Sequence, residues 1–387
     1  CLISKDADIT VAFRVELPEL FTVTSAEYEA MHSAWHKAIK VLPNFSIVHK
    51  QDWFISEEYQ GKLSEGELSF LARSSERHFN ERPYLKHSVY LFLTKSNRKR
   101  MAQQSNFSVL CRGRLVPKEI EDKDAVIKFM EAVDQFERII NDTLLLRLER
   151  MTEDELVGTE DRPGLLDRYF SLSEEGHASL EDIQLGADLV RVGDHRLCLH
   201  TLSDTEDLPM RVTTDGRYER LSTDRSDCRL SFASPVGLLL SCNHIYNQYL
   251  FIEDSDATLE RFEKQARNMH SLARYSRSNQ INEEWIQEYL NMAHSQGLTS
   301  IRAHFNVLAW SSEADQLRQI KNDVGSALAL MECTPRHNTI DTATLYWAGI
   351  PGNAADFPSE ESFYTFIEPA LCFFTAETNY KDSLSPF

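Results

Sequence analysis

The sequence of 387 residues lacks an apolar run long enough to cross a bilayer. A membrane-spanning helix needs about 20 predominantly apolar residues. The longest apolar stretches here are 237–242 and 363–376, and Glu368 interrupts the second. The first residues, Cys1-Leu-Ile-Ser-Lys, lack the basic and apolar regions of a signal peptide. We therefore expect no membrane span, and we interpret Cys1 as the start of a trimmed chain rather than as a lipid attachment point.

Basic residues are in deficit. The 41 Lys and Arg residues stand against 60 Asp and Glu residues, which leaves a formal net charge of −19. Such an excess of negative charge repels phosphate backbones and anionic membrane surfaces over most of the molecule. Any DNA contact is therefore expected to be local. With 42% hydrophobic and 26% charged residues, the composition is that of an ordinary globular protein.

The motifs of several enzyme classes are missing. Gly61-Lys62 is the sole Gly-Lys pair, and it lacks the earlier glycine and the following Ser or Thr of a phosphate-binding loop. The G-x-S-x-G elbow of serine hydrolases does not occur. The seven cysteines are odd in number and irregularly spaced, which argues against a disulfide framework. From these residues we predict no catalytic site and no cofactor in this chain.

One group of His and Cys residues has the composition of a metal site. His195, Cys198 and His200 are close in sequence, and Cys242 with His244 would complete a ligand set. Alternation along a strand, however, places Cys198 and His200 on one face and His195 on the other. Zinc sites also favour ligand pairs in tight turns, which are missing here. We therefore predict that these side chains pack in the core or on the surface and bind no metal.

One segment differs from the acidic background. Residues 95–117 contain six basic residues and no Asp or Glu. Its candidate contact residues are Lys95, Arg98, Lys99, Arg100, Phe107, Arg112 and Arg114. Cations near an aromatic ring suit single-stranded nucleic acid, through phosphate contacts and base stacking. They equally suit an acidic protein partner, and a solvated loop without a partner is the third alternative.

Periodicity predicts an α/β (α+β) fold with open mixed sheets covered by helices. Alternating residues indicate a strand over 10–17, and Thr24 with Glu27 forms a capping box that starts a helix. The run 88–94 is apolar on both faces, which is typical of a central strand. A long helix is expected over 124–148.

Acidic residues separate two expected subdomains. We predict an N-terminal α/β subdomain over 1–148 and a second α+β subdomain over 184–387. The connector between them, 149–183, holds eleven acidic and three basic residues. In the second subdomain, Gly193-Asp194 indicates a hairpin turn, and 342–347 is expected to be a strand.

Further helices are expected in the second subdomain. Asp256 and Asn282 are predicted to cap two of them, because Asp and Asn accept hydrogen bonds from the first free backbone amides of a helix. Three aromatic faces, around Trp35, Trp285 and Trp310, are interpreted as parts of the core. A groove for a partner is the alternative.

Several long, irregular segments are more distinctive than any short motif. They are Ile3-Ser-Lys-Asp-Ala-Asp-Ile-Thr-Val-Ala-Phe-Arg-Val-Glu-Leu-Pro18, Glu76-Arg-His-Phe-Asn-Glu-Arg-Pro83, Asn106-Phe-Ser108 with Cys111-Arg-Gly113, His244-Ile-Tyr-Asn-Gln-Tyr249, and Phe363-Tyr-Thr-Phe-Ile-Glu-Pro-Ala-Leu-Cys-Phe-Phe374 to Pro386-Phe387. Through them the chain resembles the TraG family of conjugative transposon proteins over essentially its whole length.

The resemblance implies a function. TraG proteins of this type look like the large cytoplasmic ATPases of type IV secretion systems, in which an N-terminal α/β region precedes a motor with Walker motifs. We expect this chain to correspond to the N-terminal region, without the ATPase domain, so that ATP and Mg would serve the full-length parent. The expected partners are channel subunits, the missing ATPase domain and other copies of the chain. The expected location is cytoplasmic, peripheral to the inner membrane.

Two other functions stay open. The first is a single-stranded DNA-binding module that uses residues 95–117. The second is a self-contained enzyme whose site is assembled from scattered residues such as His195, Cys198 and His200.

Overall fold

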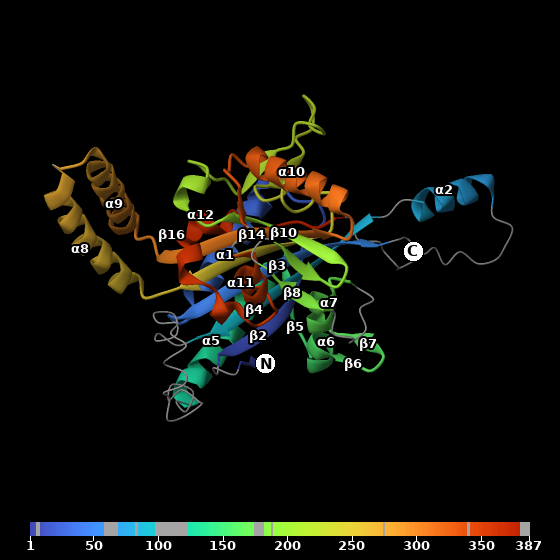
Figure 1. Cartoon of the computed structure of the whole chain (residues 1–387), viewed down its shortest axis with the longest axis horizontal. Coiled ribbons are helices and arrows are strands. Elements are labelled where there is room, and N and C mark those ends of the chain that lie inside the picture. Colours follow the sequence, from blue (N-terminus) through green and yellow to red (C-terminus); the bar gives the residue numbers. More distant parts are fainter. Residues whose placement is uncertain are drawn as a thin grey trace.

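A large antiparallel sheet organises the molecule (Figure 1). The computed structural model describes residues 1–4, 8–57, 69–81, 84–96, 123–173, 182–186, 189–273, 275–338 and 341–379. Within these residues the main sheet has twelve strands, with the order β1-β2-β4-β3-β13-β14-β10-β9-β8 along its central path. The predicted α/β class, with an open sheet covered by helices, is confirmed. In the same described ranges, no helix has both the length and the apolar character of a membrane span.

Strands and helices alternate in the first part of the chain. In chain order they are β1 (Leu2–Ile3), β2 (Ile9–Glu16), α1 (Ser25–Lys40), β3 (Ser46–Glu57), α2 (Phe70–Asn80), β4 (Tyr84–Lys95), α5 (Lys123–Asn141) and β5 (Arg147–Arg150). β4 pairs antiparallel with both β2 and β3. β2 and β3 therefore run in the same direction, as a crossover through α1 allows, but β4 lies between them. For this reason the neighbouring strands are antiparallel, where a mixed sheet was expected.

The rest of the chain continues the same sheet. Its elements are α6 (Glu153–Val157), β6 (Gly158–Thr159), β7 (Arg162–Pro163), α7 (Leu165–Ser171), β8 (Ile183–Leu185), β9 (Val190–Val192), β10 (His195–Leu202), β11 (Asp215–Arg217), β12 (Arg229–Ser231), β13 (His244–Ile252), α8 (Ser255–Ala273), α9 (Arg277–Gln296), β14 (Ser300–Ser311), α10 (Ala314–Leu330), β15 (Arg336–Asn338), α11 (Thr342–Ala348), β16 (Phe363–Phe366) and α12 (Ile367–Leu371). β3 pairs with β13 along its length. One sheet thus joins residues from both sides of the expected connector.

Several elements form where short sequence patterns predict them. Thr24 caps α1, and the side chain of Glu27 bonds back to the Thr24 amide at 2.7 Å, which is the predicted capping box. The predicted hairpin is formed by β9 and β10. Its turn contains Gly193 with a φ of 55°, a left-handed conformation that glycine adopts without a steric penalty.

Two predicted elements are wrong. The helix expected over 124–148 ends at Asn141, because the Asn141 side chain bonds to both backbone groups of Leu148 and the chain then pairs with β2 as β5. The strand expected over 342–347 is helix α11. Here Tyr346 stacks on Tyr169 with ring centroids 5.1 Å apart, so packing overrides the strand preference of the aromatic residues.

Two predicted caps are also wrong. Asn282 lies inside α9, which begins at Arg277. At α8 it is Asp254, not Asp256, whose carboxylate accepts the hydrogen bond from the Ala257 amide, at 3.2 Å. In both cases the helix starts earlier than the apolar periodicity indicates, because polar residues continue the helix beyond its buried turns.

Each face of the sheet buries a hydrophobic core. The first core joins Val48 of β3 to Trp35 of α1, and α5, α10 and α12 contribute to the same face. The second core joins Ile47 of β3 to Tyr169 of α7, with contributions from α6 and α11. Because successive strand residues point to opposite faces, the central strands are buried on both sides.

A ladder of polar side chains crosses the central strands on the second face. Asn247 of β13 donates to the side-chain oxygen of Asn306 on β14 at 2.9 Å, and the Asn247 oxygen accepts from Gln51 of β3 at 2.8 Å. The ring of His49 lies 3.0 Å from the same oxygen. Buried polar groups are costly unless they are paired. Since a slip by one residue would turn every one of these groups to the other face, the ladder fixes the register of the three strands.

Candidate functional site

A helical hairpin projects from the centre of the sheet. α8 follows β13 and α9 precedes β14, and these two strands are antiparallel neighbours. Figure 1 shows the two helices side by side, extending away from the body of the molecule. α9 has 20 residues, which corresponds to a length of about 30 Å. The hairpin therefore forms an arm where a tight turn would be enough to join the strands.

An ion pair and a ring stack fix the root of this arm. Arg302 of β14 donates from Nε and Nη2 to a carboxylate oxygen of Glu253, at 2.8 and 2.7 Å. Its third nitrogen donates to the Ser362 hydroxyl at 2.7 Å. In α9, Tyr289 stacks on Phe366 of β16 with ring centroids 4.4 Å apart. The ion pair holds the segment before α8 against β14, and the ring stack holds α9 against β16.

α8 and α9 bury a small core between them. Its buried residues are Leu259, Ala266, Leu290, Ala293 and Phe366. Towards the tip of the arm, the ring of His270 on α8 lies 2.6 Å from the carboxylate of Glu283 on α9. The inner face of α9 is therefore occupied by α8 and by the root, which leaves its outer face to solvent.

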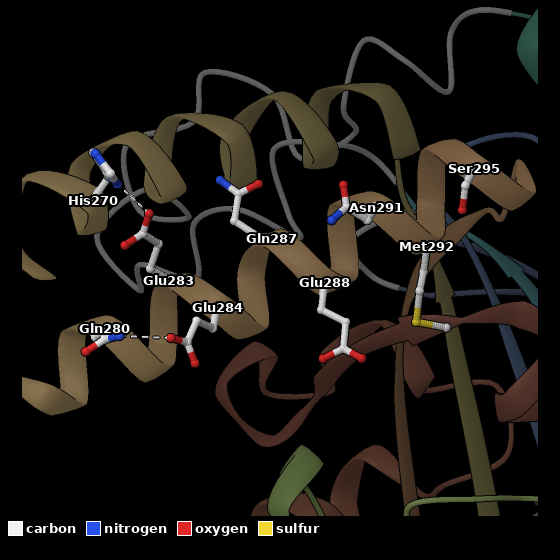
Figure 2. A pocket seen from close by; sticks show the side chains of 9 residues that line it. All are labelled: His270, Gln280, Glu283, Glu284, Gln287, Glu288, Asn291, Met292 and Ser295. Carbon is white, nitrogen blue, oxygen red and sulfur yellow. Dashed lines mark hydrogen bonds and ion pairs between the residues drawn. The ribbon is translucent and has the colours of Figure 1, made fainter.

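A shallow hollow of about 570 Å³ runs along the exposed side of α9 and reaches His270 of α8. The hollow is lined by His270, Gln280, Glu283, Glu284, Gln287, Glu288, Asn291, Met292 and Ser295. Figure 2 shows Glu284, Glu288 and Met292 pointing to the same side of the helix. Gln280 donates to Glu284 at 3.0 Å. The lining is thus mainly carboxylates and amides, with one flexible apolar side chain.

Trp285 follows the lining residue Glu284 in the sequence and is largely exposed. Its exposed fraction is 56%, and that of Met292 is 40%. Seven residues separate the two, so on a helix of 3.6 residues per turn they point within about 20° of one another. The prediction that the aromatic face around Trp285 belongs to the core is therefore wrong. For Trp35 and Trp310, which are 3% and 1% exposed, it is confirmed.

A second hollow, of about 550 Å³, lies at the root of the arm. Arg261 of α8 and Tyr364 of β16 line it, and the Arg261 guanidinium donates to the Tyr364 hydroxyl. Phe45 also lines this hollow, and the Lys95 ammonium lies 5.6 Å from the centroid of the Phe45 ring. Burial lowers the pKa of Lys95, and its ammonium donates to the backbone oxygen of Asn44.

Lys95 is the one predicted contact residue that the structure describes. Its ammonium is used within the fold, as a donor to a neighbouring loop. The other candidates, Arg98, Lys99, Arg100, Phe107, Arg112 and Arg114, lie outside the described residues. The DNA or partner contact assigned to this stretch stays a prediction.

A group of ionisable side chains is enclosed in the first core, beneath the sheet. The ring of His87 on β4 lies 2.9 Å from a carboxylate oxygen of Asp52 on β3, and 2.9 Å from the hydroxyl of Thr378. The hydroxyl, imidazole and carboxylate are thus in the order of a nucleophile, a base and an orienting acid. The ammonium of Lys50 lies 2.5 Å from the other oxygen of Asp52, and Gln248 donates to that oxygen at 2.7 Å.

The burial of this group argues for a structural role. The side chains of Lys50, Asp52 and His87 are at most 1% exposed. None of them lines either hollow. Burial alone raises the pKa of Asp52, but the charge of Lys50 and the hydrogen bond from His87 hold it below its ordinary value. Asp52 is therefore an ionised carboxylate that joins β3 to β4 and to the C-terminal segment.

The residues considered for a metal site are distributed as strand alternation predicts. Cys198 packs in the first core, and its neighbours Leu197 and Leu199 pack in the second. His200 lies on the same face as Cys198, with its ring centroid 5.3 Å from that of His337. His244 has a backbone carbonyl oxygen within 3.1 Å of each ring nitrogen. Within the described part of the chain, no three His, Cys, Asp or Glu side chains are grouped to hold a metal ion.

A comparison with known protein families gives a match to the first part of the chain. Residues 1–33 match a family described as a domain of unknown function, B. Theta Gene description (DUF3875). The match covers β1, β2 and the first half of α1. No curated protein matches the chain.

Proposed function

We propose that this chain is the docking and assembly region of a type IV secretion conjugation ATPase, and that it acts through protein contacts rather than through catalysis. The observation that carries the proposal is the exposure of Trp285 on an arm rooted in the middle of the sheet. A large, exposed aromatic residue on a projecting helix is typical of protein interfaces, where tryptophan often contributes much of the binding energy.

The sequence resemblance supports the same role. As that resemblance implies, we propose that the chain precedes an ATPase domain that would bind ATP and Mg, at the cytoplasmic side of the inner membrane. The partners we propose are subunits of the secretion channel, that ATPase domain and other copies of the chain. The net charge of −19 favours protein partners over phosphate backbones.

The test compares two exposed apolar residues. In donor cells, we expect Trp285→Ala to lower the frequency of conjugative transfer. Leu330→Ala on α10, which removes a side chain that is 71% exposed, should leave it unchanged. Loss of an interface residue worth about 2 kcal/mol weakens binding roughly thirtyfold. Immunoblotting would show whether both variants accumulate to the normal level.

A second measurement addresses catalysis. Purified protein of residues 1–387 should not hydrolyse ATP, whereas the parent that includes the following segment should. ATP turnover by the purified chain, or transfer that is unaffected by Trp285→Ala, would contradict the proposal.

A further inference from the structure

We propose that the outer face of α9 binds a basic amphipathic helix of a partner protein. The apolar side chains of that helix would cover Trp285 and Met292, and its lysine or arginine side chains would face Glu284 and Glu288. This inference rests on the proposed docking function and adds the chemistry of the partner.

An apolar stripe runs along one side of α9. Ile281, Trp285 and Met292 follow one another at spacings of four and seven residues, which places them along one side of the helix. The core of the hairpin uses Leu290 and Ala293 for the contact with α8, and neither Trp285 nor Met292 belongs to it. Covering Trp285 and Met292 would remove apolar surface from water, which favours association.

The charged residues of α9 are almost all acidic. Between residues 278 and 296 the sequence has three glutamates and no lysine or arginine. Glu284 and Glu288 are four residues apart, and like charges at this spacing destabilise a helix. A cationic side chain placed between the two carboxylates would relieve this repulsion. The acidic row lies beside the apolar stripe, so one amphipathic partner could contact both.

The shape of the surface selects the kind of partner. The hollow extends from Gln280 to Ser295, which is about four turns of the helix. A helix lying in a groove is the recognition mode that fits such a length. An added strand would need the free backbone groups of a sheet edge, which a helix does not offer. The carboxylates would repel nucleic acid and anionic membranes.

The probe is a fluorescein-labelled lysine/leucine peptide of about 20 residues, which forms an amphipathic helix of about 30 Å. Its binding to the purified chain is followed by fluorescence anisotropy at low and at moderate salt. We expect saturable binding that Glu284→Gln with Glu288→Gln weakens about tenfold at low salt, or about 1.4 kcal/mol. Trp285→Ala should weaken it by a similar factor at both salt concentrations.

The matched control removes two charges from the same arm. Asp256 and Glu260 on α8 are exposed, so Asp256→Asn with Glu260→Gln makes the same change in net charge away from the hollow. We expect peptide binding by this variant to match that of the unaltered chain. Equal losses in the two double variants would overturn the proposal, because they would show a general charge effect. Equal binding of a scrambled peptide of the same composition would also overturn it.

A second copy of the chain is the competing occupant. Sedimentation of the purified chain would detect it as a dimer that Trp285→Ala dissociates. This result would show that a second copy, and not a basic helix, covers this face of α9. Transfer assays separate the two proposals. If the α9 variants lower transfer but bind the peptide normally, the docking function stands and the basic partner is wrong. If they lose peptide binding and transfer is unchanged, the docking function fails.

Discussion

The side-chain amide nitrogen of Asn306 donates a hydrogen bond to Nε2 of His304, at 3.0 Å. The other ring nitrogen of His304 lies 2.5 Å from the backbone oxygen of Glu361, to which it donates. Both nitrogens are therefore satisfied when the imidazole is neutral. A second proton would place an N–H group against the Asn306 amide, and burial already lowers the pKa of His304 to about 3.

Stability should decrease as the pH falls below about 6.5. Burial lowers the pKa of His49 and His304 to about 3, and that of His200 and His244 to about 4. The unfolded chain binds protons that the folded chain excludes, so the stability is fully present above the ordinary histidine pKa and is lost on acidification. Each such histidine contributes a slope of up to about 1.4 kcal/mol per pH unit. Burial raises the pKa of Glu377, which titrates in the opposite sense. Urea unfolding between pH 7 and pH 5 would measure the sum.

His304→Gln isolates one of these contributions. The variant lacks one titrating group, so its stability should depend less steeply on pH, by about one proton. An acid slope equal to that of the unaltered chain would show that His304 is protonated in the folded protein. The comparison depends on the difference between slopes, so any constant loss of stability from the substitution does not affect it.

Asp52→Asn should strongly destabilise the fold. The substitution leaves the buried Lys50 ammonium without its anionic partner, and breaking a buried ion pair in this way costs about 3–5 kcal/mol. The double variant Lys50→Met with Asp52→Leu removes both charges and should recover most of this loss. Chemical unfolding of the unaltered chain, the single variant and the double variant would measure their free energies of unfolding. A double variant as unstable as Asp52→Asn would contradict the role assigned to the charge pair.

Arg302→Ala should loosen the root of the arm. Glu253 would lose a guanidinium that is 7% exposed, and we expect a loss of about 3 kcal/mol. Arg191 provides a control, because its ion pair with Asp194 is more exposed and should contribute less than about 1 kcal/mol. Hydrogen exchange would show faster exchange of α8 amides in Arg302→Ala only. Equal effects of the two substitutions would contradict the importance of the root.

Alanine substitutions at two glycines should change the stability in opposite directions. Gly297 ends α9 with a φ of 64°, and alanine there should cost about 1 kcal/mol. Gly325 lies within α10, and a β-carbon added there would have open space within 4 Å, so alanine should stabilise by about 0.5–1 kcal/mol. Thermal unfolding of both variants would test the pair. A gain at Gly297 would show that this turn tolerates another conformation.

Sequence periodicity predicted the parts of the fold that depend on neighbouring residues. The capping box of Thr24 with Glu27 is an example, because it involves two residues that are three positions apart. Helix α11 could not be predicted in the same way. Whether these residues form a helix or a strand is decided by the contact of Tyr346 with Tyr169, which is far away in the sequence.

The candidate site was predicted less well, for a physical reason. An aromatic residue at helical spacing looks the same whether its face is buried or exposed, so Trp285 was assigned to the core. The signal that could have identified it is the set of charges beside it, Glu284 and Glu288. The buried ladder of Asn247 and Asn306 depends on pairing between distant strands, which periodicity does not reveal.

The position of the hairpin between β13 and β14 also determines how the molecule would bear a mechanical load. A pull on the arm along the strand direction would make β13 and β14 slide as a pair past their outer neighbours, β3 and β10. Hydrogen bonds in an antiparallel sheet are perpendicular to the strands, so many of them would resist such sliding at once. A partner attached to α9 would thus be tethered through the strongest direction of the sheet.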